Sequence, residues 1–138
     1  MARGFNLSST FVHLGHGATA TPVPDFEWSQ QFLDDYTNRF ASDGAEGLLV
    51  CVTPQDATWT TWERHPAGEE VVVLLSGHVE MIQEVDGEEH SIELCPGEAA
   101  VNPKGVWHRT VVHEPGAALF ITPGVGTEHR PFSPVRDG

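Results

Sequence analysis

The sequence predicts an all-β domain of 138 residues with one short helical segment near its N-terminus. Three observations support this fold class. Short segments with β-type patterns follow one another from residue 48 to residue 122, separated by turn residues. The 14 glycines and 10 prolines suit a fold with many turns. Only one segment has a helical period, and a chain of this length is expected to form a single domain with its own core.

The helical segment is expected at residues 26–41. Aromatic side chains recur there at every fourth position: Trp28, Phe32, Tyr36 and Phe40. Such a stripe forms one face of a helix and is expected to pack into the core. Asp25 or Ser29 is expected to cap the helix, and Gly44 lies just beyond its end. Upstream, Leu7–Leu14 is a candidate strand.

Eight further strands are expected: Leu48–Thr53, Thr58–His65, Val71–Leu75, Val79–Val85, Glu88–Leu94, Ala99–Val101, Trp107–Val112 and Ala117–Thr122. Asp86-Gly87 between two of them is a favoured two-residue hairpin turn. Gly77 and Gly97 are expected at tight turns, where a positive φ is favourable only for glycine. This succession of strands predicts a β-barrel or a β-sandwich.

Composition argues against several classes of partner. Twenty acidic residues and seven lysines and arginines give a formal net charge of −13. Nucleic acids and anionic membranes need clustered cations, so neither is expected as a partner. No apolar run approaches the ~20 residues that span a bilayer, and no secretory signal is readable, so we expect a cytoplasmic protein. Cys51 and Cys95 are expected to be buried thiols in a reducing cytoplasm, and a disulfide between them is the alternative.

The strand expected at Thr58–His65 carries the first candidate site. Alternation places four of its side chains on one face: Trp59, Thr61, Glu63 and His65. The turn after His65 reverses the chain, and either Glu69 or Glu70 on the next strand then faces the same interior. His108, on the strand Trp107–Val112, is the candidate for a fourth group.

Two segments resemble the motifs of the cupin superfamily. The first motif is G-x5-H-x-H-x3–4-E-x6-G, and it is similar to Glu63-x-His65-x4-Glu70-x6-Gly77. The second is G-x5-P-x-G-x2-H-x3-N, and it is similar to Gly97-x5-Pro103-x-Gly105-x2-His108. The motifs lie in residues 57–112, and the flanking strands extend the resemblance to roughly 45–125. The resemblance implies a small single-domain cupin, a jelly-roll β-barrel with a short N-terminal helical segment.

The resemblance also implies a metal site. Its ligand set is His65, Glu70, His108 and Glu63, where Glu63 stands in place of the usual first histidine. Two further departures are Ala57 in place of Gly and Val112 in place of Asn. Two nitrogens and up to four oxygens suit one divalent transition metal ion such as Mn, Fe, Ni or Zn.

Alternatives remain for each of these groups. Glu63 either ligates the metal or is a rim carboxylate paired with Arg64 or Arg109. If it does not ligate, it is the candidate catalytic general base. The two histidines are either ligands or core imidazoles of a metal-free cupin. Glu69 is the register alternative to Glu70, because a one-residue slip exchanges the faces of a strand.

The function implied is that of a metal-dependent enzyme of dioxygenase, isomerase, decarboxylase or lyase type, acting on a small polar molecule. The alternative is a non-catalytic cupin module that binds or senses a small ligand. Trp59 and Thr61 are expected to line the substrate pocket. We expect an N-terminal extension at 1–44, the barrel at 45–125 and a C-terminal tail at 126–138 that folds over the barrel mouth or trails free. A homodimer is expected, in which Leu7–Leu14 adds a strand across the subunit boundary.

Overall fold

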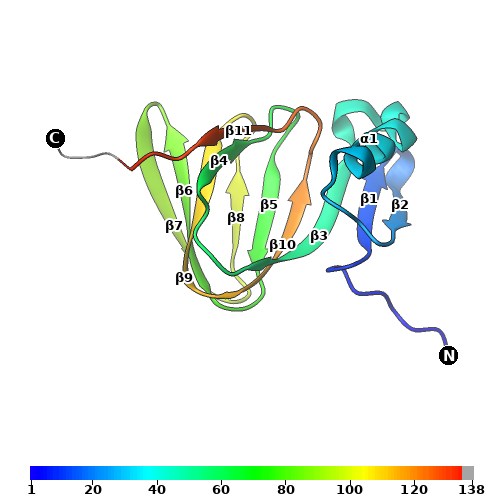
Figure 1. Ribbon diagram of the computed structural model, residues 1–138, viewed down its shortest axis with the longest axis horizontal. Helices are drawn as coiled ribbons and strands as arrows, with labels where there is room; N and C mark the ends of the chain where they lie inside the picture. The colour runs from blue at the N-terminus through cyan, green and yellow to red at the C-terminus, as the bar shows by residue number, and fades with distance from the viewer. Residues whose placement is uncertain (135–138) are drawn as a thin grey trace.

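The computed structural model describes residues 1–134. Its N-terminal part consists of β1 (Phe11–Gly15), η1 (His16–Ala18), β2 (Thr19–Val23), α1 (Gln30–Arg39) and η2 (Ala41–Glu46). The remaining strands are β3 (Leu48–Gln55), β4 (Thr61–Arg64), β5 (Glu70–Leu74), β6 (His78–Val85), β7 (Glu88–Leu94), β8 (Ala99–Asn102), β9 (Trp107–Glu114), β10 (Gly116–Thr122) and β11 (Glu128–Pro131). All eight strands predicted after residue 45 are therefore present, with shifted ends (Figure 1).

The strands form two antiparallel sheets. One has the order β2-β1-β3-β10-β5-β8, and the other has the order β11-β4-β9-β6-β7 (Figure 1). Both sheets contribute to a shared core: Phe11, Cys51, Val72, Leu74, Val79, Met81, Leu94, Ala100, Ala118 and Phe120. Within residues 1–134 no backbone pairing joins the two sheets, so the arrangement is a jelly-roll sandwich rather than the closed barrel that was predicted. The chain crosses between the sheets through turns, which leaves four edge strands unpaired with the opposite sheet.

Local turn chemistry agrees with the prediction. Asp86 and Gly87 join β6 to β7 with φ values of 53° and 78°, as a type I′ hairpin requires. Gly77 and Gly97 have φ values of 87° and 89°. These turns join β5 to β6, β6 to β7 and β7 to β8.

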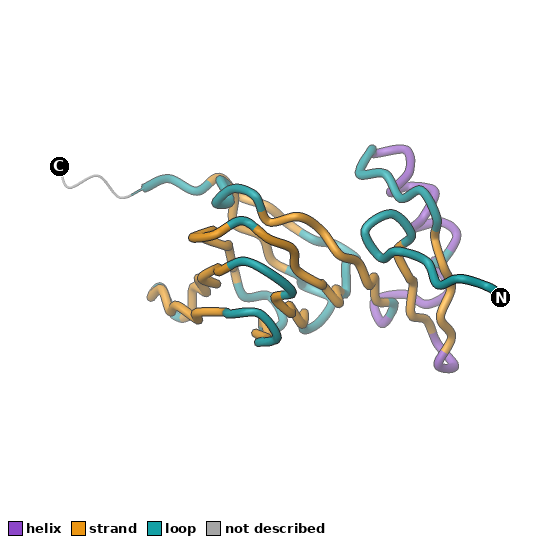
Figure 2. The backbone as a smooth tube through the Cα atoms, turned by 90° about the horizontal axis from the view of Figure 1, so that it is seen from below, coloured by secondary structure: helices purple, strands orange, loops and turns teal. Residues whose placement is uncertain are grey.

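The N-terminal part differs from the prediction in its packing. The helix begins at Gln30, and the Ser29 hydroxyl caps it by accepting a hydrogen bond from the Phe32 amide at 3.2 Å. No residue of α1 is buried, and Trp28 is 59% exposed, so the aromatic stripe is not part of the core. Figure 2 shows the helical segments gathered at the end of the molecule that holds β1 and β2. The helix lies beside a cavity there, which leaves its aromatic face half-exposed.

The first strand pairs within the chain. β1 pairs with β2 on one side and with β3 on the other, so both of its edges are occupied. The expected role of Leu7–Leu14 as a strand added across a subunit boundary is therefore wrong. The homodimer itself stays a prediction that light scattering would test.

The C-terminal segment is part of the sandwich. Residues 128–131 form β11, which pairs with β4, so the predicted boundary at residue 126 cuts through a structured region. Trp62 is buried under Phe132, with ring centroids 6.2 Å apart, and Trp107 lies under Arg64 and Arg130. The last four residues of the expected tail lie outside the described residues.

The two cysteines have different environments. Cys51 on β3 is buried, as predicted, whereas Cys95 is exposed, and both are free thiols. Cys95 lies in the turn between β7 and β8, where the chain leaves the sheet, so the prediction of burial is wrong for this residue. Within the described residues, no helix has the length and apolar character needed to cross a membrane.

Candidate metal centre

Four side chains of the two motifs converge between the sheets. Glu63 lies on β4, Glu70 opens β5, His108 lies on β9, and His65 follows β4. Glu63 and His108 are directly paired across β4 and β9 although 45 residues separate them in the chain. One ligand atom from each of the four side chains lies within 4.8 Å of the others. We call these four residues the His/Glu cluster.

The two imidazoles face both carboxylates. His65 Nε2 lies 3.1 Å from Glu63 Oε1 and 3.1 Å from Glu70 Oε2. His108 Nε2 lies 3.4 Å from Glu63 Oε1 and 3.4 Å from Glu70 Oε1. His65, Glu70 and His108 are buried, and the Glu63 side chain is 22% exposed. His65 Nε2 nevertheless has no hydrogen-bond partner of acceptable geometry among the described residues, so a buried nitrogen points at the cluster unsatisfied.

The opposite ring nitrogens are held from outside the cluster. His108 Nδ1 lies 3.4 Å from the Val106 carbonyl oxygen, which can only accept a hydrogen bond. His65 Nδ1 lies 2.9 Å from the hydroxyl oxygen of Thr127, and that hydroxyl donates to the Gly124 carbonyl. Both networks assign the ring proton to Nδ1. In the neutral form of each imidazole, the Nε2 lone pair then points into the cluster, which is the usual orientation of histidines that bind metals.

Glu70 is held by a buried polar network. Its Oε1 accepts a hydrogen bond from Asn102 Nδ2 at 2.9 Å, and its Oε2 accepts one from the Thr122 hydroxyl at 2.6 Å. Gln83 Nε2 in turn donates to Asn102 Oδ1 at 2.9 Å. Glu69 is exposed, because alternation along the strand turns it to the opposite face. The structure thus brings Glu70, and not Glu69, into the cluster.

Glu63 has a partner that the sequence reasoning did not pair with it. His129 on β11 contacts Glu63 Oε2 at 2.9 Å, while Arg64 pairs with Glu128 at 2.8 Å. The alternative of an ion pair between Glu63 and Arg64 or Arg109 is therefore not found. No spacing rule links positions 63 and 129. Only the pairing of β4 with β11 brings the two residues together.

The pKa values of the His/Glu cluster show that the site favours positive charge. Burial raises the pKa of Glu63, but its contacts with His108 and His65 outweigh burial and hold that pKa well below its usual range. For His65, burial lowers the pKa, and contacts with Glu63 and Glu70 overcome this and raise it to about 9. Two carboxylates in a buried site thus favour a cation, and a divalent ion would balance both charges.

A cavity of about 750 Å³ adjoins the cluster. Glu63, His65 and Glu70 line it, and so does Trp59, whose indole N–H donates to Gln55 Oε1 at 3.0 Å. Thr61 was expected on this wall but is exposed and does not line the cavity. It lies at the first position of β4, opposite Pro131, beyond the edge of the cavity.

Some residues that line the cavity were not predicted from the sequence. His13, Tyr36 and Phe40 also line the cavity, although they belong to the N-terminal part. The aromatic stripe was the one signal for Tyr36 and Phe40, and the sequence reasoning assigned it to the core.

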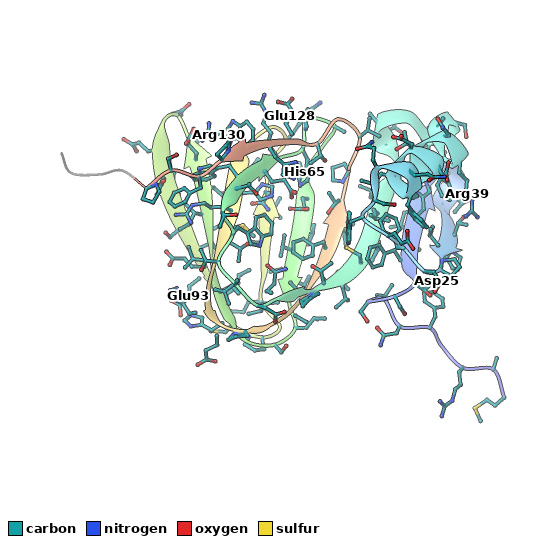
Figure 3. The ribbon with its side chains drawn as sticks, viewed as in Figure 1. Asp25, Arg39, His65, Glu93, Glu128 and Arg130 are labelled. Atoms are coloured by element: carbon teal, nitrogen blue, oxygen red, sulfur yellow. The ribbon has the colours of Figure 1, made fainter. Side chains whose placement is uncertain are left out.

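In Figure 3, His65 lies below β11, the strand that carries Glu128 and Arg130.

Known structures with a similar fold share little sequence with this chain. The hydroquinone 1,2-dioxygenase of Sphingomonas sp. TTNP3 is 20% identical, with a TM-score of 0.47 over 54% of this chain and 58% of that one. A cupin-2 domain containing protein of Shewanella frigidimarina NCIMB 400 is 21% identical, with a TM-score of 0.46 over 62% and 71%. Peruvianin-I, a cysteine peptidase of Thevetia peruviana latex, is 19% identical, with a TM-score of 0.51 over 63% and 56%.

These likenesses concern the fold alone. The chain spans less than two thirds of the first and third of these proteins, at 58% and 56% of their lengths. No protein of curated function matches the chain significantly. A family model, described as the cupin domain, matches residues 48–124 and therefore more than half of the chain. The protein belongs to the cupin family.

Proposed function

We propose that the His/Glu cluster holds one divalent transition metal ion and that the protein is a metal-dependent enzyme acting on a small molecule in the adjoining cavity. The observation that carries this proposal is the unsatisfied Nε2 of His65, buried and facing two carboxylates. Burying an ionisable cluster without a counter-ion costs free energy, so groups arranged in this way favour a cation between them.

The ligand set fits the ions considered from the sequence. Two imidazole nitrogens and two carboxylates suit Mn, Fe, Ni or Zn, and the carboxylates neutralise a divalent charge. When bound, such an ion supplies Lewis acidity or a centre for oxygen chemistry. Dioxygenase, isomerase, decarboxylase and lyase reactions are the candidate activities.

Glu63 is the fourth candidate ligand and, if it does not ligate the metal, the group best placed to hold or move a proton. Its Oε1 faces the two cluster imidazoles, and its Oε2 contacts His129 Nε2 at 2.9 Å. The His129 side chain is 55% exposed, so it connects Glu63 to solvent. A carboxylate with one oxygen toward the substrate site and the other toward an exposed imidazole can exchange protons during a reaction.

Elemental analysis of the gently purified protein tests the metal site. We expect near-stoichiometric transition metal in the wild type and almost none in the double variant His65→Ala/His108→Ala, with the fold retained by circular dichroism. The matched control is His90→Ala/His113→Ala, which removes two exposed histidines that belong to neither candidate metal group of the described residues and should keep the metal. Metal retained by the first variant, or a folded wild type that binds none of the four ions on reconstitution, would overturn the proposal.

A turnover assay separates the enzyme from the non-catalytic binding module. Oxygen uptake and product formation are measured for the metal-loaded protein across a panel of small organic acids and sugars. Product formation that disappears in a Glu63→Gln variant with wild-type metal content supports the enzyme and the role of Glu63 in proton transfer. Tight binding of a panel member that is recovered unchanged would instead favour the binding module.

A further inference from the structure

A second polar cluster, in the N-terminal part of the chain, places His13 and Tyr36 on the wall of the same cavity. His13 on β1 contacts the hydroxyl of Tyr36, on α1, through Nδ1 at 2.5 Å. Its other nitrogen, Nε2, contacts Asp43 Oδ2, in η2, at 2.7 Å. We call these three residues the Tyr36 triad. Figure 1 shows α1 beside β1, at the end of the molecule away from β6 and β7.

The hydrogen bonds of the triad define where its protons lie. Asp43 accepts the His16 backbone N–H at 3.0 Å, and this bond, followed by the contact with His13, lowers the pKa of Asp43. Asp43 is therefore a carboxylate and accepts the Nε2–H of His13. In the neutral imidazole, Nδ1 is then an acceptor, so the Tyr36 hydroxyl donates its proton to it.

The Tyr36 oxygen is left with acceptor capacity. A phenol oxygen has lone pairs in addition to its single O–H, and His13 is its one hydrogen-bond partner among the described residues. Burial, and then the charge of Asp43, raises the pKa of Tyr36, so the phenol stays neutral. Tyr36 therefore presents a neutral acceptor to whatever occupies the cavity.

The triad is packed tightly in place. His13 is 4% exposed and stacks on Phe40 with ring centroids 3.8 Å apart. Two glycines make room for it: a Cβ at Gly47 would lie 2.8 Å from His13 Cε1, and a Cβ at Gly15 would lie 2.5 Å from Asp43 Oδ2. The Tyr36 hydroxyl is consequently held at one position on the cavity wall.

The wall between the two polar clusters is apolar and largely aromatic. Its members include Phe26, Trp28, Phe40, Leu49, Trp59 and Phe120. Trp28 is 59% exposed and Val125, which also lines the cavity, is 49% exposed. Large exposed apolar side chains beside a cavity are typical of a binding site, and aromatic walls favour flat apolar ligands.

We propose that the cavity binds a ligand with a flat apolar body, an anionic oxygen at the His/Glu cluster and a hydroxyl that donates a hydrogen bond to Tyr36. The anionic end rests on the proposed metal site, whereas the apolar body and the hydroxyl rest on the N-terminal wall. Tyr36 is then a specificity-determining residue, with His13 and Asp43 as positioning residues. The ligand differs from the small polar molecule expected from the sequence, because the wall offers few polar groups between the clusters.

Matched aromatic acids test this proposal on the metal-loaded protein. The probes are 6-hydroxy-2-naphthoate, 2-naphthoate and 6-methoxy-2-naphthoate, the corresponding 4′-substituted biphenyl-4-carboxylates, and acetate. Binding is measured by calorimetry. Of the naphthoate and biphenyl series, we expect the one that binds more tightly to exceed acetate in affinity by at least about tenfold, because it buries apolar area. Within it, the hydroxyl compound should bind about fivefold more tightly than the other two, because one hydrogen bond contributes about 1 kcal/mol.

Tyr36→Phe keeps the aromatic ring and removes the acceptor. This variant should abolish the preference for the hydroxyl compound and leave the affinity for the unsubstituted acid unchanged. Asn38→Ala, an exposed position of α1 that does not line the cavity, is the matched control and should keep the preference. Aromatic acids that bind no better than acetate, a methoxy compound that equals the hydroxyl compound, or a hydroxyl preference that survives in Tyr36→Phe would overturn the proposal.

The two proposals fail in different ways. Metal content is measured independently of ligand binding, and Tyr36→Phe should leave it unchanged. In the metal-free His65→Ala/His108→Ala variant, the preference for 2-naphthol over naphthalene should persist, because it depends on Tyr36 alone. A wild type without metal that still shows this preference would refute the metal site and support the ligand class. A metal-loaded wild type without any preference for the hydroxyl compound would support the metal site and refute the proposed ligand class.

Discussion

The substitution Asn102→Leu removes a hydrogen bond that orients the Glu70 carboxylate but leaves the charge of Glu70 in place. Asn102 is 1% exposed, donates to Glu70 Oε1 at 2.9 Å and accepts from Gln83 at 2.9 Å. Leucine has a similar volume but can neither donate a hydrogen bond to Glu70 nor accept one from Gln83. The bond to the carboxylate contributes about 1.5–3 kcal/mol and the bond to Gln83 about 1 kcal/mol. The free energy of unfolding should therefore fall by roughly 2.5–4 kcal/mol.

The same substitution should weaken metal binding. Residues that orient a ligand contribute about 10–100-fold to metal affinity, because a carboxylate free to rotate loses entropy on binding the ion. Competition with a chromophoric chelator measures the affinity, and urea denaturation of the metal-free protein measures stability. Val101→Thr is the control, since Val101 is the exposed neighbour on the same strand and should change neither quantity substantially. A folded Asn102→Leu variant with wild-type metal affinity would refute this orienting role.

Three further predictions follow from local environments. Tyr36 is the chain's one tyrosine, so phenolate absorbance reports it alone, and its titration should lie above the usual pKa of 10.0 because of burial and then Asp43. The folded state then keeps a proton that the unfolded state loses, and stability should fall as pH rises above that value. Burial, followed by Glu70 and Glu63, raises the pKa of Cys51 to about 12, so a thiol reagent should modify Cys95 and spare Cys51. Gly77→Ala should destabilise the fold far more than Gly87→Ala in urea denaturation. Both have positive φ, which costs about 1–2 kcal/mol, but only at Gly77 does a Cβ meet backbone, 2.5 Å from the Glu114 carbonyl oxygen.

Each of these has a clear contrary result. A Tyr36 titration at the ordinary pKa would show that the phenol is solvated and not enclosed by the triad. Equal reaction of both thiols in the folded protein would show that Cys51 is accessible through the cavity. Equal destabilisation by the two alanine substitutions would show that the close approach at Gly77 is relieved at no cost.

Much of the sandwich was predictable because its signals are local. Alternation located the strands after residue 45, and Asp86-Gly87 located the hairpin, since each depends on a few adjacent residues. The motif spacing brought His65 and His108 to one site, and β4 does pair with β9 there. The motif spacing did not decide whether Glu69 or Glu70 faces the interior. That depended on which face of the strand the neighbouring strands cover.

The errors concern elements whose partners lie far away in the chain. The stripe of α1 has the period of a core helix, but whether it is covered depends on where β1 and β3 place the helix. Cys95 was expected to be buried as a thiol of a reducing compartment, but it lies in the exposed turn between β7 and β8. Residues 128–131 lack a strong strand signal and become a strand through pairing with β4.

By itself, the sequence determined the strand succession, the turns and the cupin motifs, because side-chain alternation and glycine conformations act over two to seven residues. Only the tertiary structure decided that Glu63 contacts His129, that Asn102 holds Glu70, and that His13 and Tyr36, held together with Asp43 in one triad, line the same cavity. Those contacts join residues 23 to 66 positions apart. They form because packing two sheets and a helix around a shared interior determines which distant side chains meet, and no local pattern encodes that choice.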